Sequence, residues 1–126
     1  MDEIERVICD SAALAEGGTG VRFALGEGER APTGFAIRHL GSVHAFVNRC
    51  PHMGTELDWQ PGEFFEASGL YLVCATHGAL FQPATGFCVA GPCKGAHLGA
   101  LRTRERNGRV LLLNPSDPAR APDETR

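Results

Sequence analysis

Residues 50–54 read Cys-Pro-His-Met-Gly, and residues 74–78 read Cys-Ala-Thr-His-Gly. Together they supply two thiolates and two imidazoles, from Cys50, His52, Cys74 and His77. A Cys-X-His run joined to a later Cys-X-X-His run is the ligand pattern of a [2Fe-2S] centre, with two Cys on one iron and two His on the other. We therefore predict one [2Fe-2S] cluster per chain, held by these four side chains.

The residues beyond the two runs extend this pattern. Leu80 and Phe81 follow the second run, and the pairs Thr85-Gly86 and Gly91-Pro92 come after them. On these residues, the stretch from about Asn48 to Leu98 resembles the Rieske iron-sulfur family, in particular its small soluble ferredoxins. The resemblance implies that the two runs are the tips of two facing loops. It also implies that Gly91 and Pro92 form a third loop, which covers the cluster.

The remaining sequence predicts an all-β fold. Apolar residues occur in short β-branched or alternating runs between glycines, and no run keeps a period of 3.6 residues. We expect strands over Glu5–Cys9, Val21–Leu25, Gly34–Leu40, Val43–Asn48, Leu70–Val73, Ala79–Gln82, Ala100–Glu105 and Arg109–Asn114. The resemblance implies a Rieske-type antiparallel β-sandwich with an inserted cluster-binding subdomain of two loops.

Short polar and glycine-containing pairs predict the turns between these strands. Gly41-Ser42 is expected to join the third and fourth strands, and Asn107-Gly108 the last two. The run 83–86, Pro-Ala-Thr-Gly, is expected to reverse the chain after the second ligand loop. We expect residues 1–114 to form one domain, with the cluster-binding subdomain at about 49–93. Residues 115–126 are rich in proline and charge, which predicts a disordered tail.

Length and charge exclude several classes of protein. With 126 residues the chain is expected to hold one domain, and no run approaches the roughly twenty apolar residues of a membrane span. The net charge is -3 and no basic block is present, so we expect no nucleic-acid partner. The acidic start lacks the pattern of a secretory signal, and two of the five cysteines are assigned to iron. These features favour a cytoplasmic protein.

Two positions after the second run predict a low reduction potential. By the resemblance, high-potential relatives place a Ser just after the second glycine and a Tyr two residues later, and both hydroxyls hydrogen-bond the cluster or its ligand. Here these positions hold Ala79 and Phe81. Loss of two donors destabilises the more negative, reduced state, so we expect a potential near the low end of the Rieske range, about -150 mV.

Charged residues are unevenly distributed around the ligand runs. Between Cys50 and Cys93 there are four acids and no Lys or Arg, the acids being Glu56, Asp58, Glu63 and Glu66. This distribution favours a redox partner with a basic docking patch. The alternative is that these acids form a solvated surface that keeps the protein soluble.

The other cysteines, histidines and the single tryptophan have simpler interpretations. Cys88 and Cys93 flank the Gly91-Pro92 pair; we favour two thiols over a local disulfide, which stays open. Cys9 is expected in the core. We expect no metal ligand among the remaining His residues, because four ligands complete the site, and a loop anchor at Trp59. These histidines are His39, His44 and His97.

The leading functional hypothesis is an electron carrier, not an enzyme. By resemblance it carries one electron between a reductase and a terminal redox enzyme, as the ferredoxin component of a dioxygenase does. One alternative is the small subunit of a nitrite reductase or oxygenase complex. Oxygen activation, however, needs a mononuclear iron in a large domain, and the nitrite reductase subunits generally lack the ligands. The other alternative is a structural zinc module with two Cys and two His ligands.

Overall fold

The computed structural model describes residues 4–26, 28, 31–51, 54–58, 60–76 and 78–114. His52, Met53, Trp59, His77 and the expected tail 115–126 lie outside these described residues. Within them the chain forms strands, all paired antiparallel, and one short 3-10 helix, η1 (Ser11–Ala13). The all-β prediction is confirmed. No helix in the described ranges has the length and apolar character needed to cross a bilayer.

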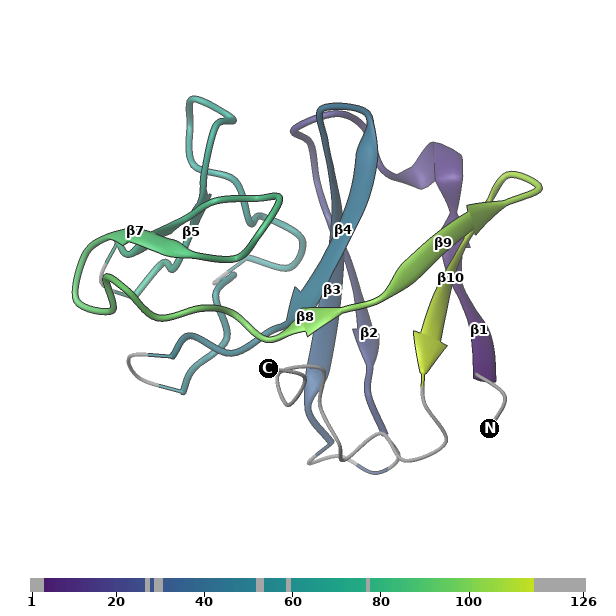
Figure 1. Ribbon diagram of the computed structural model, residues 1–126, viewed down its shortest axis with the longest axis horizontal. Coiled ribbons are helices and arrows are strands. Elements are labelled where there is room, and N and C mark those ends of the chain that lie inside the picture. The colour runs from purple at the N-terminus through teal and green to yellow at the C-terminus, as the bar shows by residue number, and fades with distance from the viewer. Residues whose placement is uncertain are drawn as a thin grey trace.

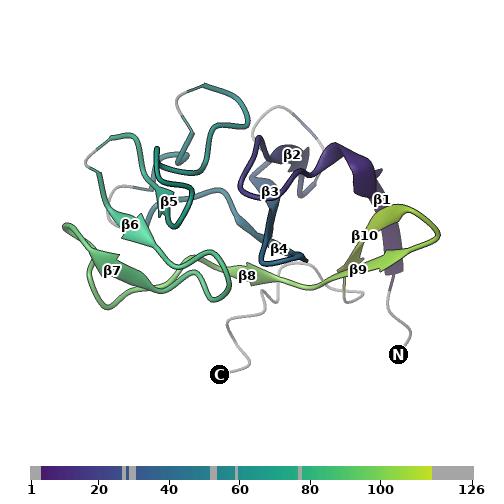
Figure 2. The ribbon, with the colours of Figure 1, turned by 90° about the horizontal axis from the view of Figure 1, so that it is seen from above.

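The strands build three small sheets, which Figures 1 and 2 show from two directions. The first contains β1 (Ile4–Asp10), β10 (Arg109–Asn114) and β9 (Thr103–Arg106), in that order. The second has the order β2 (Val21–Ala24), β3 (Thr33–His39), β4 (Ser42–Val47) and β8 (Ala100–Leu101). The third has the order β5 (Leu72–Val73), β6 (Leu80–Phe81) and β7 (Cys88–Ala90). Both views place the first and third sheets at opposite ends, with the second between them.

The middle sheet is buried on both faces, and strand alternation explains how. Successive side chains of a strand point to opposite faces. Ala36 therefore packs toward Val110 and Leu112 of β10, while its neighbours Phe35 and Ile37 pack on the other face, toward the third sheet. The protein thus has two apolar cores that share one sheet as a common wall.

The core beside the third sheet contains both Cys50 and Cys74. Phe64 lies there parallel to Phe35, with ring centroids 3.9 Å apart and planes 10° apart. Phe46, Leu57, Leu72, Phe81 and Leu98 complete its large apolar side chains. The predicted ligand cysteines therefore lie within the larger of the two apolar clusters formed by the described residues.

The hairpin turns show one correct and one displaced prediction. Asn107 and Gly108 turn the chain as expected, both with positive φ (54° and 78°). The β3–β4 turn, predicted at Gly41-Ser42, is formed instead by Leu40 (φ 51°) and Gly41 (φ 83°). Leu rarely adopts this conformation. The Glu16 carboxylate stabilises it by accepting hydrogen bonds from the N–H groups of Leu40 (2.6 Å) and Gly41 (2.8 Å), which lower the pKa of Glu16.

Three strand predictions need correction. The expected strand Ala100–Glu105 is interrupted at Arg102, so that β8 pairs with β4 while β9 pairs with β10. Strand β7 (Cys88–Ala90) was missed, because three residues between glycines give too short a pattern to detect. The expected strand Leu70–Val73 begins only at Leu72, since Leu70 lies in an exposed loop.

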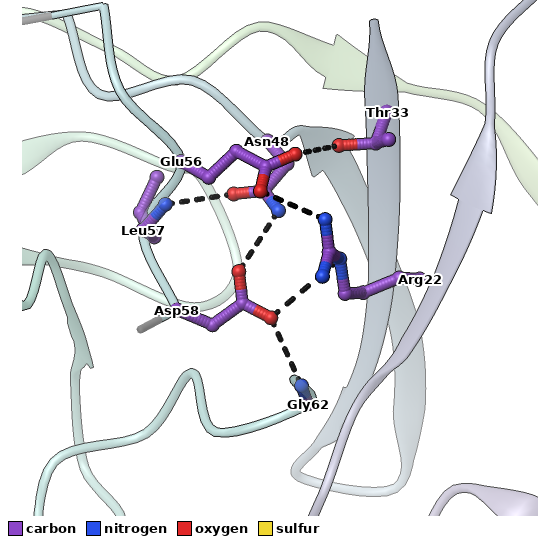
Figure 3. A network of polar contacts seen from close by, with 7 residues as sticks. All are labelled: Arg22, Thr33, Asn48, Glu56, Leu57, Asp58 and Gly62. Carbon is purple, nitrogen blue, oxygen red and sulfur yellow. Dashed lines mark hydrogen bonds and ion pairs between the residues drawn. The ribbon is translucent and has the colours of Figure 1, made fainter. Parts of the chain in front are cut away.

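A buried polar network fixes the segment that follows Cys50 (Figure 3). The Asp58 carboxylate has a fully buried side chain and accepts hydrogen bonds from Asn48 Nδ2 (3.0 Å) and Gly62 N–H (2.9 Å). Asn48 Oδ1 accepts a hydrogen bond from Leu57 N–H at 2.8 Å. Arg22 Nε lies 3.7 Å from Asp58. The network ties the loop after Cys50 to β2 and to the end of β4.

The guanidinium group of Arg22 also forms an ion pair at the exposed edge of this network. Arg22 Nη2 forms an ion pair with Glu56 at 2.8 Å, and the Thr33 hydroxyl donates to the other oxygen of Glu56 at 2.8 Å. Two of the four acids of the ligand region are therefore partners of one arginine in the sandwich.

We predict that Asp58→Ala lowers the free energy of unfolding by about 2–4 kcal/mol, because buried donors of Asn48 and Gly62 lose their acceptor. Denaturation by guanidinium chloride measures this change. Glu63→Ala is the matched control: it removes an exposed acid of the same loop and should alter stability by no more than about 0.5 kcal/mol. Equal losses in the two variants would contradict a structural role for Asp58.

Candidate metal centre

The two predicted thiol ligands come together in the structure. Cys50 follows β4 and Cys74 follows β5, and each is 1% exposed. Burial and a hydrogen bond with the Cys50 thiol raise the pKa of Cys74. Two buried thiols in one core cluster suit ligation of one metal ion, which would hold both as thiolates. The position of the two predicted imidazole ligands, His52 and His77, is not described and stays a prediction.

The first ligand loop is closed by its own backbone. The Cys50 N–H donates to the carbonyl of Thr55 at 2.7 Å, and the Gly54 N–H donates to the carbonyl of Cys50 at 2.7 Å. Gly54 has φ +76°, a conformation that glycine adopts without a steric penalty. The glycine four residues after the cysteine therefore turns the chain back on itself.

The second ligand loop repeats the same pair of hydrogen bonds. The Cys74 N–H donates to the carbonyl of Ala79 at 2.9 Å, and the Gly78 N–H donates to the carbonyl of Cys74 at 2.8 Å. Gly78 has φ +74°. Two segments that share only a Cys and a Gly four residues apart thus have the same closing hydrogen bonds. In the sequence, each segment has its predicted His between these two residues.

The two loops face each other. The hydroxyl oxygens of Thr55 and Thr76 are 3.5 Å apart, and the Ala75 N–H donates to the carbonyl of Leu57 at 3.0 Å. Hydrogen bonds from the Thr76 backbone and hydroxyl to Cys74 lower the pKa of that thiol, against the larger effect of burial. Donors aimed at the sulfur favour the thiolate, which is the form that binds metal.

Gly91, in the loop that is predicted to cover the cluster, packs closely on the second predicted ligand loop. A Cβ atom on Gly91 would lie only 2.7 Å from Cα of Ala79, so the loop packs directly on the backbone of the second ligand loop. Gly91 also has φ +98°. This approach requires glycine for two reasons, its missing side chain and its dihedral angle.

Cys88 and Cys93 pack in the same buried core as Cys50 and Cys74, a placement that the sequence does not predict. Their sulfurs are 2.9 Å apart, both are free thiols, and both are buried. Burial, then contacts with the thiols of Cys88 and Cys50, raise the pKa of Cys93 to about 12. One feature of the sequence could have predicted this placement. Cys93 directly follows the Gly91-Pro92 pair, so it is expected to lie near the group that this loop covers.

Ala79 and Phe81 are 1% and 0% exposed and pack in the same core as both ligand cysteines. The positions that lack a hydroxyl therefore border the ligand site, as the potential argument assumes. The other histidines are elsewhere: His39 and His44 lie on the β3–β4 hairpin, and His97 packs edge-on to Phe87 with ring centroids 5.0 Å apart. Burial and His39 lower the pKa of His44.

Several solved structures share this fold. The chain is 21% identical to a chain in the complex of reduced oxygenase and oxidised ferredoxin in carbazole 1,9a-dioxygenase, over 89% of this chain and 94% of that chain, with a TM-score of 0.68. It is 23% identical to the Sphingomonas yanoikuyae B1 ferredoxin, over 89% and 100% of the two chains, with a TM-score of 0.69.

A third similar structure is the putative NADH-dependent nitrite reductase small subunit from Mycobacterium tuberculosis. It is 18% identical over 93% of this chain and 100% of that chain, with a TM-score of 0.67. No curated protein sequence matches. At these identities the structures show the shared fold alone.

The sequence itself gives a more specific match. The family model described as Rieske [2Fe-2S] domain matches residues 5–110, which include both predicted ligand loops, the Gly91-Pro92 loop and strands β2 to β9, with most of β1 and the start of β10. The buried thiol pair and the two loops with matching hydrogen bonds fit the cluster that this domain binds. The chain therefore belongs to the Rieske [2Fe-2S] domain family.

Proposed function

We propose that this protein carries one electron between a reductase and a terminal redox enzyme such as an oxygenase. The observation that carries the proposal is the convergence of the buried Cys50 and Cys74 thiols between two facing loops of matching geometry. The [2Fe-2S] cluster supplies a single reversible electron transfer when bound. The solved complex of an oxygenase with a ferredoxin supports this class of partner.

In this proposal Cys50 and Cys74 hold the inner iron, and His52 and His77 hold the outer one. The loop residues next to the two histidines, Pro51 and Gly78, are exposed, whereas the cysteines are buried. The histidine side of the site would therefore face solvent and a docked partner. A ring nitrogen that binds no metal is free to donate a hydrogen bond there. Electrons would enter and leave at this edge.

The nitrite reductase small subunit is the second candidate, because the fold is shared. The ligand pattern favours the carrier, since all four ligand positions are occupied by Cys and His. The free thiols of Cys88 and Cys93 support a reducing cytoplasmic location. A zinc module is disfavoured by the described loops, which lie between strands and carry no helix.

The experiment that tests the proposal is metal and sulfide analysis with EPR. We expect two irons and two acid-labile sulfides per chain, and a Rieske-type EPR signal that is present only after reduction. Cys50→Ser should abolish the cluster, because the serine oxygen is a poor replacement for a thiolate. Cys9→Ser, a half-buried cysteine of β1, is the control and should keep full iron content. One zinc without sulfide would contradict the proposal.

Gly91→Ala is predicted to reduce cluster occupancy and to speed cluster loss in air, because its Cβ would collide with Ala79 and lift the covering loop. Gly95→Ala is the matched control. Gly95 lies in the same loop with nearly the same φ (+95° against +98°), but a Cβ there has no atom within 4 Å. Iron content and the decay of visible absorbance measure the effect. Equal losses in both variants would show that backbone strain, and not the contact with Ala79, causes the loss of the cluster.

Fewer acids are free to attract a basic patch on the partner than the sequence alone suggests. Asp58 is buried, Glu56 is paired with Arg22, and Glu66 accepts hydrogen bonds from Ser68. Glu63 is exposed. Arg49 lies beside Gly54 of the first ligand loop and adds positive charge near the rim. We therefore propose that Glu63 contributes most of the attraction.

This charge proposal predicts how the rate of electron transfer to a basic acceptor, such as cytochrome c, depends on salt. The rate should fall as ionic strength rises, because salt screens the attraction. At low salt Glu63→Gln should slow transfer, and Arg49→Gln should accelerate it. Stopped-flow absorbance measures both. A rate that stays constant with salt, or the opposite signs in the two variants, would contradict an acidic docking face.

A further inference from the structure

The first sheet has an outer face that turns away from the middle sheet. Val110 and Leu112 of β10 pack into the sandwich core. Because successive side chains of a strand alternate between faces, Leu111 and its partners in the register, Val7 of β1 and Arg104 of β9, lie on the outer face. Figures 1 and 2 show this sheet at the end of the molecule opposite the third sheet. The outer face is therefore remote from the predicted metal centre.

Two arginines lie directly opposite each other on this face. Arg106 of β9 and Arg109 of β10 are partners in the register of the hairpin. Like charges at such a cross-strand position repel and destabilise the pairing. Across the described residues, the Arg109 guanidinium forms no hydrogen bond or ion pair, not even with Asp10, its partner in β1. An anion bound between the two arginines would remove this repulsion.

Glu5 shows how the arginines of this face bind a carboxylate. One oxygen of Glu5 accepts a hydrogen bond from Arg104 at 2.9 Å, and the other accepts one from Arg106. A guanidinium has five N–H donors, so Arg106 keeps donors for a second carboxylate. Within the described residues, one carboxylate is thus shared by two arginines, and the third arginine, Arg109, has none.

A groove of about 480 Å³ lies among these side chains. It is lined by charged and polar groups and by two apolar ones, namely Glu5, Val7, Arg106, Asn107, Arg109 and Leu111. Val7 is 48% exposed, whereas Leu111 is 8% exposed. The volume falls in the range of small-molecule sites, which also combine an apolar surface with a few polar groups. Covering Val7 with a hydrocarbon group would be favourable.

We propose that this groove binds a small organic carboxylate, whose head is held between Arg106 and Arg109 and whose hydrocarbon body covers Val7. The head can accept a hydrogen bond from each guanidinium, as the Glu5 carboxylate does from two arginines. The apolar part of the lining favours such a ligand over an inorganic anion. The site involves no residue of the predicted metal centre, so the inference is independent of the proposed function.

The test is an NMR titration of the oxidised holoprotein with hexanoate, followed through backbone amide signals. We expect saturable shifts at Val7, Arg109 and Leu111, with a dissociation constant of roughly 1 mM. Hexanamide lacks the charge and should give no saturable shift. Acetate and inorganic phosphate lack the hydrocarbon body and should bind at least about tenfold more weakly.

Substitutions separate the two parts of the site. Arg109→Gln should weaken hexanoate binding about fivefold, because it removes one of the two guanidiniums. Arg104→Gln is the matched control: it removes an equal charge from the same face but outside the groove, and should weaken binding less than about twofold. Val7→Ser should weaken the binding of hexanoate and leave that of acetate unchanged. Glu5→Gln should strengthen binding, because its carboxylate no longer competes for Arg106.

Four results would overturn the inference. These are equal losses in Arg109→Gln and Arg104→Gln, saturable binding of hexanamide, weaker binding in Glu5→Gln, and no saturable shift on this sheet at about tenfold the expected dissociation constant. If one variant does not fold, the opposite signs expected for Arg109→Gln and Glu5→Gln leave the other as a test. Failure of the proposed function looks different, because it would appear in the iron analysis and EPR and not in these amide signals.

Discussion

The burial of Cys50 and Cys74 together in one apolar core is the constraint on which the rest of the structure depends. Two buried thiols placed together are costly to ionise, since each anion would destabilise the other in a medium of low polarity. A metal cation bound between the two sulfurs would remove the free-energy cost of ionising both thiols. The loops must therefore position both cysteines through groups other than the sulfurs. They do so by backbone hydrogen bonds that involve no ligand atom, closing at Gly54 and Gly78.

The location of this pair follows from the shared middle sheet. Because β3 is apolar on both faces, one side packs the sandwich and the other forms the floor of the ligand site. Asp58 and Asn48 then fix the first ligand loop to the edge of that sheet through buried hydrogen bonds. Asp58 therefore stabilises the fold, although its charge alone favours a role in a docking surface.

Much of this arrangement could be predicted from sequence, and the failures have physical causes. The glycines of the ligand runs and the Asn107-Gly108 turn act locally, so their dihedral angles are readable from neighbouring residues. The Leu40 turn was misplaced because its stabilising group, Glu16, is distant in sequence. The burial of Asp58 depends likewise on partners from other strands. Strand β7 depends on pairing with β6, which no local pattern encodes.

The burial of the two predicted ligand sulfurs determines which groups would stabilise the charge of an added electron. Two ferric ions, two sulfides and two thiolates sum to zero, so an added electron would give a cluster held by Cys50 and Cys74 one negative charge. In a buried core that charge has little water to solvate it. Fixed donors then take the place of solvent. Thr76 provides them to Cys74 through its backbone and its hydroxyl. The second predicted ligand loop would therefore supply part of the stabilisation that water gives to an exposed charge.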